Sequence, residues 1–223
     1  MHYAFQWAPI WEHRDQIEQG LIVTVALSAA ALLGAVLIGI LVGTAGAAKH
    51  KLPRVGALLY VEGVRNVPLL LHIYFWYLGL SALDLPAFLC AWLGLSIYSG
   101  AYAAEIVRAG VLSIPTGQAE GAAALGLGRW RTLFLVIYPQ AFRVIAPSLA
   151  SLFSQLIKDS SLASVVAVGE LTYQAGAIEA DTFRTFEVYI TITVLYLILV
   201  TAVSHALLWL PAARAIPVRI EDA

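Results

Sequence analysis

Two pairs of opposite charges lie within long apolar stretches of the sequence. Glu62 and Arg65 are three residues apart, and Glu105 and Arg108 repeat that spacing. Residues three apart share one face of an α-helix, so each pair could form an internal ion pair. One member of each pair could instead lie on the path of a solute through the membrane and bind a group of opposite charge on it. Both uses remain open, because charges at membrane depth usually face the protein interior.

Other polar residues interrupt the same apolar stretches. Asn66 lies just before Pro68, where a proline-bent helix leaves backbone carbonyls free, so the break could face a substrate or be a plain kink. His72 fits a packed polar group better than a proton relay. A further polar group ends an apolar stretch and could form an outer gate, a structural latch or a solvated helix end: Lys158, Asp159 and Ser160.

The sequence lacks the residue patterns of an enzyme or a metal site. His72 and His205 lie in different apolar stretches, and no Gly-x-Ser-x-Gly occurs. Cys90 is the only cysteine, so no cysteine cluster can hold a metal. A chain that binds ATP itself would carry a glycine-rich phosphate loop followed by lysine, and none is present. We therefore predict no catalytic residue, no metal and no cofactor bound by this chain.

The composition requires a bilayer around much of the chain. Of its 223 residues 61% are hydrophobic and 12% are charged, about half the charged share of soluble domains. Five stretches are long enough to cross about 30 Å of hydrocarbon as helices, and small residues in the first predict close packing against its neighbours. They cover residues 21–46, 55–83, 86–112, 133–157 (interrupted by Pro139 and Pro147) and 186–210. We predict an all-α integral membrane protein with five transmembrane helices.

Basic residues on alternate connections set the predicted orientation. Three basic residues and no acidic one follow the first stretch, and Arg129 and Arg131 end the third connection. The positive-inside rule then puts the N-terminus outside and the C-terminus in the cytoplasm. We expect an outer N-terminal segment at 1–20, a membrane domain at 21–210 and a cytoplasmic tail at 211–223. The net charge of −1 gives no reason to expect nucleic acid binding.

The connection between the third and fourth stretches is helix-prone and too long for a plain connector. A start at Pro115 and an end at Gly126 or Gly128 predict a short cytoplasmic helix over about 115–128. Small residues along it would let another protein approach closely, with Glu120 as a charged anchor. The alternative is an ordinary amphipathic helix lying at the membrane surface.

This connection resembles the EAA loop of bacterial ABC importer permeases. That signature reads Glu-Ala-Ala, three residues, Gly, nine residues and Ile-x-Leu-Pro, and the chain matches its spacing from Glu120 through Gly126 to Pro139. The chain departs from the signature at three positions. Glycine stands in place of the first alanine, valine in place of the isoleucine, and tyrosine in place of the leucine. The resemblance implies a coupling helix that docks in a groove of an ATPase subunit. Its candidate contact residues are Gln118, Glu120, Gly121, Ala122, Gly126 and Arg129.

The surrounding segments narrow the resemblance. The chain is similar from about residue 20 to 210 to the polar amino acid permeases of ABC importers, the histidine, glutamine and glutamate type. The segments that carry this similarity are 60–71, 99–111, 114–118, 138–143 and 157–162. The resemblance implies the type I ABC importer permease (MetI-like) fold, multi-pass in the bacterial inner membrane with the N-terminus in the periplasm.

The resemblance also implies the task and the partners. The chain would translocate a polar L-amino acid, or a close derivative such as an opine, through a membrane pathway completed by a second identical or homologous permease. ATP and Mg²⁺ would be held by a pair of separate ATPase subunits, and a periplasmic binding protein would deliver the amino acid; membrane lipid would surround the spans. Asn66, His72 and Ser160 differ from the residues that are usual in the family at these positions. They lie near the predicted path, so these differences bear on which substrate is carried.

Two rival functions make different demands on the sequence. A secondary transporter or channel would need ion-coupling carboxylates at mid-membrane and often an inverted repeat, and we find neither. An intramembrane enzyme would need a serine–histidine or paired aspartate constellation within the spans, but aspartate is absent from all five interiors.

Overall fold

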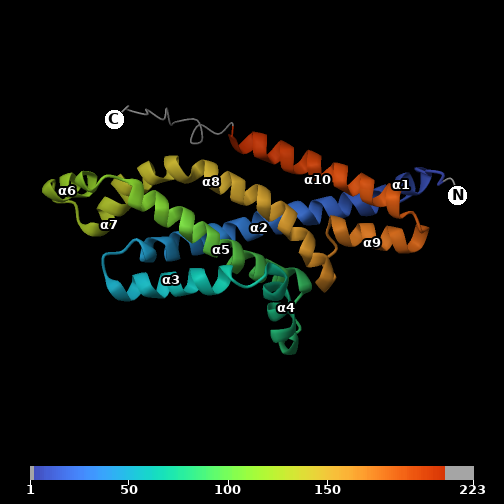
Figure 1. The fold of residues 1–223 in the computed structure, drawn as a ribbon, viewed down its shortest axis with the longest axis horizontal. Helices are drawn as coiled ribbons and strands as arrows, with labels where there is room; N and C mark the ends of the chain where they lie inside the picture. The colour runs from blue at the N-terminus through green and yellow to red at the C-terminus, as the bar shows by residue number, and fades with distance from the viewer. Residues whose placement is uncertain (1–2, 209–223) are drawn as a thin grey trace.

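The computed structural model describes residues 3–208, in which every regular element is helical. Four helical runs are long and apolar enough to cross a membrane: α2 (Arg14–Gly46), α5 (Ala87–Ser113), the run Arg129–Val166 and α10 (Thr185–Leu208). Figure 1 shows them running roughly along the long axis of the molecule. The prediction of an all-α membrane protein is therefore confirmed. The predicted tail at 211–223 and the end of the fifth stretch lie outside the described residues.

The centre of the bundle is the contact between α2 and α5, which small residues make possible. A Cβ added to Gly39 would lie 2.5 Å from the Cβ of Ala103, and one added to Gly43 would lie 2.6 Å from the carbonyl oxygen of Ala104. Any larger side chain at either glycine would push the helices apart. The close packing predicted for the first span is confirmed, although α2 begins at Arg14, inside the segment expected to precede the membrane domain.

The second predicted span, 55–83, is two helices rather than one. Helix α3 (Lys51–Arg65) ends before Pro68. Helix α4 (Leu69–Gly79) runs in a different direction from α3 and projects from the bundle, as Figure 1 shows. With 11 residues α4 is about 16 Å long, too short to cross about 30 Å of hydrocarbon alone. Together α3 and α4 cover the second of the five predicted spans. A 3₁₀ turn, η1 (Ser81–Leu83), leads to α5.

The fourth span is continuous where two interruptions were expected. It consists of α7 (Arg129–Thr132), a π turn (Leu133–Ile137), α8 (Tyr138–Asp159) and the 3₁₀ turn η3 (Ser160–Val166). In the π turn the N–H of Tyr138 donates to the carbonyl of Leu133. This wider turn places Pro139 at the start of α8, where its missing N–H is tolerated. Pro147 lies inside α8 without ending it.

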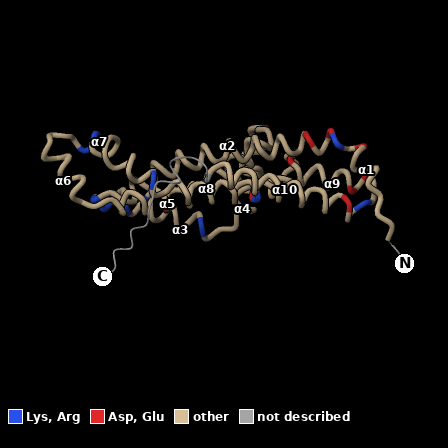
Figure 2. Tube along the Cα trace, turned by 90° about the horizontal axis from the view of Figure 1, so that it is seen from above, with Lys and Arg blue, Asp and Glu red and all other residues tan. Residues whose placement is uncertain are grey.

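Two short helices occupy the end of the molecule that holds the N-terminus. α1 (Ala8–Glu12) precedes α2, and α9 (Leu171–Thr182), which the sequence did not predict, packs between α2 and α10. At the other end α6 (Thr116–Ala124) is the outermost element. Figure 2 shows basic positions gathered around α6 and α7, and most acidic positions toward α1 and α9. The two ends of the bundle therefore differ in charge.

Candidate functional site

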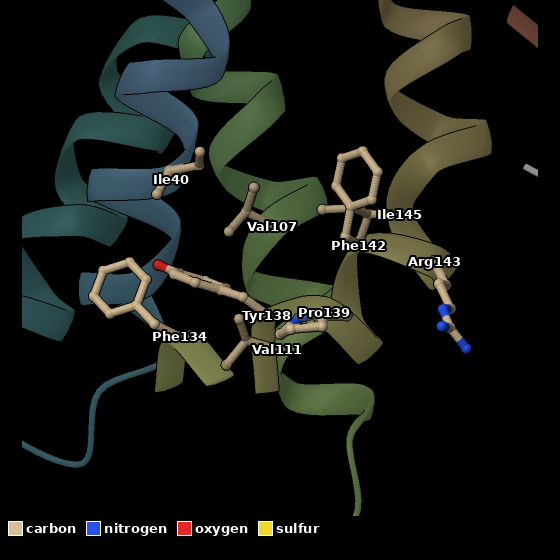
Figure 3. Close-up of a pocket in the computed structure, with 10 residues that line it drawn as sticks. Ile40, Val107, Val111, Phe134, Tyr138, Pro139, Phe142, Arg143 and Ile145 are labelled. Atoms are coloured by element: carbon tan, nitrogen blue, oxygen red, sulfur yellow. The ribbon is translucent and has the colours of Figure 1, made fainter. Parts of the chain in front are cut away.

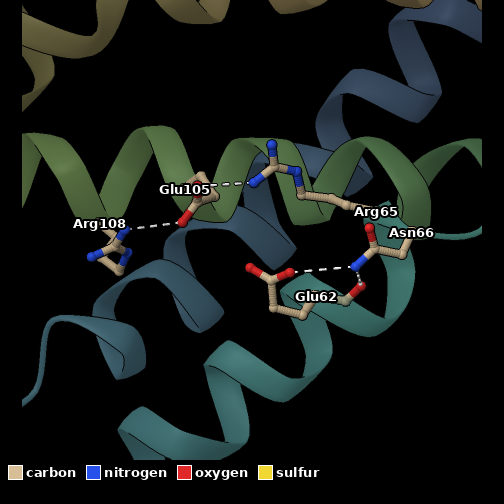
Figure 4. A network of polar contacts seen from close by, with 5 residues as sticks. All are labelled: Glu62, Arg65, Asn66, Glu105 and Arg108. Atoms are coloured by element: carbon tan, nitrogen blue, oxygen red, sulfur yellow. Dashed lines mark hydrogen bonds and ion pairs between the residues drawn. The ribbon is translucent and has the colours of Figure 1, made fainter.

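A cluster of three charged side chains joins α3 to α5. The carboxylate of Glu105 accepts a hydrogen bond from Arg65 at 2.9 Å and another from Arg108 at 3.0 Å (Figure 4). The side chain of each member is about one third exposed. The ion pair predicted for Glu105 and Arg108 is present. With two guanidinium groups against one carboxylate, the cluster keeps an excess positive charge.

The ion pair predicted between Glu62 and Arg65 is wrong. Arg65 turns to α5, while the Glu62 carboxylate accepts a hydrogen bond from the Asn66 side chain at 3.3 Å. The same Asn66 amide donates to the Glu62 backbone carbonyl at 2.7 Å and so ends α3. Spacing of three allowed the predicted pair, but the carboxylate of Glu105 on the neighbouring helix is the nearer partner for the guanidinium. Glu62 itself is exposed.

Two tyrosines extend this cluster along α5. The Arg65 guanidinium lies 4.8 Å from the ring centre of Tyr102, and the hydroxyls of Tyr102 and Tyr98 are 3.1 Å apart. Residues separated by three or four positions share a helix face, so α5 presents a polar stripe formed by Tyr98, Tyr102, Glu105 and Arg108. We did not predict the tyrosines from the sequence. Their helical spacing from Glu105 was the signal that would have identified them.

His72 and Asn66 both support the bend between α3 and α4. Pro68 has no N–H to donate to the carbonyl of Val64, and the ring Nε2 of His72 lies 3.1 Å from that oxygen. The His72 ring also packs 5.6 Å from the Tyr98 ring, centre to centre. The bend therefore places α4 against the end of the polar stripe, and it gives His72 a structural contact there.

The three residues at the end of α8 lie in different surroundings. Asp159 accepts a hydrogen bond from Gln155 at 2.8 Å, and the Lys158 side chain is exposed. Ser160 is fully buried, and its hydroxyl donates to the carbonyl of Ile157 at 2.8 Å. Ser160 thus packs inside the bundle, whereas Lys158 and Asp159 reach the surface.

The loop that joins α6 to α7 contains a left-handed glycine. Gly126 has φ +78°, its N–H donates to Ala123 at 2.9 Å, and the next N–H, of Leu127, donates to Ala122 at 3.0 Å. These two bonds form the Schellman motif that ends a helix. Only a residue without a Cβ adopts this backbone at no steric cost, which explains why glycine follows α6 at this point.

Most candidate contact residues of this loop are available to a partner. Gln118, Glu120, Gly121 and Arg129 are exposed, whereas Ala122 is 5% exposed and faces the bundle. The side chain of Gln118 accepts a hydrogen bond of 3.3 Å from Gln140, which connects α6 to the start of α8. The structure thus holds α6 against the spans while leaving its outer face open.

An apolar pocket lies elsewhere in the bundle. It measures about 830 Å³ and lies between α2, α5 and α8 beside the π turn (Figure 3). The Arg143 guanidinium points away from the hydrophobic lining, and the Tyr138 hydroxyl is hydrogen-bonded to Thr44 of α2. The cavity therefore offers a polar solute no free charged partner. Its lining residues are Ile40, Val107, Val111, Phe134, Tyr138, Pro139, Ala141, Phe142, Arg143 and Ile145.

A buried carboxylate fixes α9 at the N-terminal end. Glu170 is fully buried and accepts backbone N–H groups from Thr172 at 2.9 Å and Tyr173 at 2.8 Å, as a helix N-cap. The hydroxyl of Tyr196 on α10 donates to the same carboxylate at 2.8 Å. Burial raises the pKa of Glu170 above its ordinary value, and these hydrogen bonds act against that rise. Within residues 3–208 no cluster of ligands could hold a metal ion.

Comparison with known proteins gives one consistent family. A family model described as "Binding-protein-dependent transport system inner membrane component" matches residues 35–213. The glutamine transport system permease protein GlnP of Escherichia coli (strain K12) is 37% identical over 207 residues, which cover 91% of this chain and 94% of that protein. The nopaline transport system permease protein NocQ of Agrobacterium fabrum is 32% identical over 200 residues, which cover 83% of this chain and 85% of that protein.

Solved structures agree with these relatives. A chain from a crystal structure of an amino acid ABC transporter with histidines has a TM-score of 0.82 and 33% identity, covering 92% of this chain and 97% of that one. A chain from the MetNI methionine ABC transporter in an inward-facing conformation has a TM-score of 0.77 at 19% identity, which shows a shared fold.

Proposed function

Because the chain belongs to the family of binding-protein-dependent transport system inner membrane components, we propose that it carries a polar L-amino acid, or a close derivative such as an opine, along the polar stripe of α5. The chain is a permease subunit of a type I ABC importer, and ATP hydrolysis in such importers is done by separate subunits. The observation that carries the proposal is the contact of Glu105 with both Arg65 and Arg108.

The chemistry of this cluster suits a zwitterion. Arg65 or Arg108 can bind the carboxylate of a solute without leaving Glu105 alone, because the second arginine remains beside it. Glu105 and the tyrosine hydroxyls supply acceptors for an ammonium group. The relatives named for glutamine and nopaline transport fit this class of solute.

A second permease would complete this path. Charged groups that are one third exposed are costly against lipid, so a protein surface or a water-filled passage must face them. The neighbouring helices also expose apolar side chains, with Leu59 of α3 at 70% and Phe75 of α4 at 66%. An identical or homologous permease that covers α3 and α4 would place two polar stripes around one passage.

The remaining partners follow from the charge difference between the two ends. The positive-inside rule puts the basic end, with α6, in the cytoplasm of a bacterium, against the ATPase subunits that bind ATP and Mg²⁺. The opposite end, with α1 and α9, then faces the periplasm, where a binding protein delivers the solute.

The path is tested by uptake into vesicles that contain the whole transporter. Arg65→Gln should lower uptake of the transported amino acid at least tenfold while the complex still assembles. Asp181→Asn, on the exposed side of α9, is the matched control and should transport normally. Normal uptake by Arg65→Gln, or uptake by the permease alone down an ion gradient, would refute the proposed path.

Coupling is tested separately by changes in the loop. Glu120→Lys, or a bulky residue in place of Gly126, should uncouple ATP hydrolysis from uptake without preventing membrane insertion. Normal uptake by both variants would count against docking of an ATPase on α6.

A further inference from the structure

One arginine of α8 lies at membrane depth and faces outward. Arg143 is exposed, and within residues 3–208 no carboxylate lies within ion-pair distance of its guanidinium. It precedes Lys158, at the outer end of α8, by 15 residues, or about 22 Å of helix. Because the hydrocarbon layer is about 30 Å thick, the backbone of Arg143 lies about 8 Å inside the inner boundary of that layer. A charge at this depth is costly unless an anion accompanies it.

The apolar pocket between α2, α5 and α8 lies directly beside this arginine. Arg143 is one of its lining residues, and its guanidinium points away from the hydrophobic side chains (Figure 3). The other lining residues are apolar except for the Tyr138 hydroxyl, which is hydrogen-bonded to Thr44. The pocket volume of about 830 Å³ is in the range of sites that hold a small organic ligand. A ligand that matches both the pocket and the arginine has a hydrocarbon tail and an anionic head.

The position of the pocket favours a lipid over a protein as its occupant. Its α8 residues belong to a candidate membrane span, so hydrocarbon rather than water surrounds this part of the chain. Its described lining residues come from α2, α5, the π turn and α8, and none comes from α3 or α4, which the proposed second permease would cover. The pocket lies toward the basic end of the bundle, which the positive-inside rule puts at the inner leaflet (Figure 2). Basic pockets between spans on that side bind anionic lipid headgroups.

We propose that this pocket is a lipid site, in which an acyl chain of an anionic phospholipid lies between α2, α5 and α8 while its phosphate pairs with Arg143. The guanidinium can donate two parallel hydrogen bonds to phosphate oxygens. Its long apolar stem crosses the remaining distance to the headgroup layer. A lipid held in this way contacts three spans at once, and it is distinct from the solute that the importer carries.

The experiment counts the lipids that stay on the whole purified transporter, by native mass spectrometry after exchange into phosphatidylglycerol or phosphatidylcholine. The wild type should retain phosphatidylglycerol over phosphatidylcholine by about fivefold or more. Arg143→Gln should abolish this preference, and Arg143→Lys should keep part of it because an ammonium still pairs with phosphate. Arg54→Gln is the matched control, since Arg54 is an exposed arginine of α3 that is not among the lining residues. Equal retention by Arg143→Gln and this control would refute the site.

Two further variants test whether the pocket itself holds the acyl chain. Val111→Phe fills the pocket without changing the charge, so it should lower the retention of phosphatidylglycerol, and unchanged retention would overturn the inference. Benzoylphenylalanine in place of Phe142, a lining residue that is 52% exposed, reports by photo-cross-linking what covers the pocket. Cross-links to phospholipid would support the lipid site. Cross-links only to a second permease or an ATPase subunit, or none to lipid, would refute it. Neither measurement involves uptake, so its outcome is independent of the proposed solute path.

Discussion

Gly126 and Gly121 differ in backbone conformation although both stand in open space. A Cβ on either glycine would meet nothing within 4 Å, yet Gly126 alone has a positive φ. Gly126→Ala should therefore destabilise the end of α6 by about 1–2 kcal/mol. Gly121→Ala, within the helix, should stabilise it by about 1 kcal/mol. Hydrogen exchange of the α6 amides measures both changes, and equal exchange in the two variants would contradict this account.

Glu105 and Glu62 form a second matched pair of residues. Glu105→Gln removes the charge that two arginines share, so the permease should lose about 2 kcal/mol of stability. Glu62 contacts only the Asn66 amide through its carboxylate, so Glu62→Gln should stay within about 0.5 kcal/mol of the wild type. Thermal unfolding in detergent at one protein concentration compares them. A larger loss of stability for Glu62→Gln than for Glu105→Gln would contradict the assignment of the shared ion pair to Glu105.

At the residue scale, the sequence predicted that these charged side chains form ion pairs, but it did not predict every partner correctly. The spacing of Glu105 and Arg108 was sufficient for their ion pair, because both lie on one helix. Arg65 was paired with the wrong carboxylate, because its partner lies on another helix and spacing carries no information about neighbouring helices. Tyr98 and Tyr102 were missed because only the charged residues of that stretch, Glu105 and Arg108, were considered as path residues.

One buried carboxylate caps α9 and ties it to α10. Glu170→Ala would leave two backbone N–H groups and the Tyr196 hydroxyl without their acceptor, so the loss should be about 3 kcal/mol. Tyr196→Phe removes one of these bonds and should cost about 1 kcal/mol. Asp181→Ala, on the exposed side of α9, should be nearly neutral. Protease cleavage within α9 of the intact permease ranks the three variants, and equal resistance would contradict the role of Glu170.

At the element scale, long apolar helices were predictable and their interruptions were not. α5 agrees with its predicted range within one residue at each end, since apolar length alone defines it. The bend expected at Pro68 is present, and Pro68 is the residue that precedes α4. The interruption expected at Pro139 is absent, because the π turn before Pro139 accommodates the missing N–H. Helix α9 was missed because its start depends on a cap from Glu170, which looked like an ordinary acidic residue of a loop.

At the scale of the whole molecule, the two ends of the bundle have different proposed roles, ATPase docking at one end and delivery of the solute at the other. In the proposed function α6 receives the ATPase, and the hydrogen bond between Gln118 and Gln140 joins α6 to the start of α8. The same end carries the apolar pocket between α2, α5 and α8, beside the π turn that precedes α8. This arrangement only functions as an importer if α6 lies in the cytoplasm.

The orientation can be measured with single cysteines, because the native Cys90 is 1% exposed and should not react. Gly117→Cys places a thiol on the open face of α6, and Glu12→Cys places one on the exposed side of α1. A membrane-impermeant maleimide should label Glu12→Cys in cells whose outer membrane is permeabilised, and Gly117→Cys only after lysis. Labelling of Gly117→Cys from outside would place α6 beyond the reach of any cytoplasmic ATPase, and coupling through α6 would then be excluded.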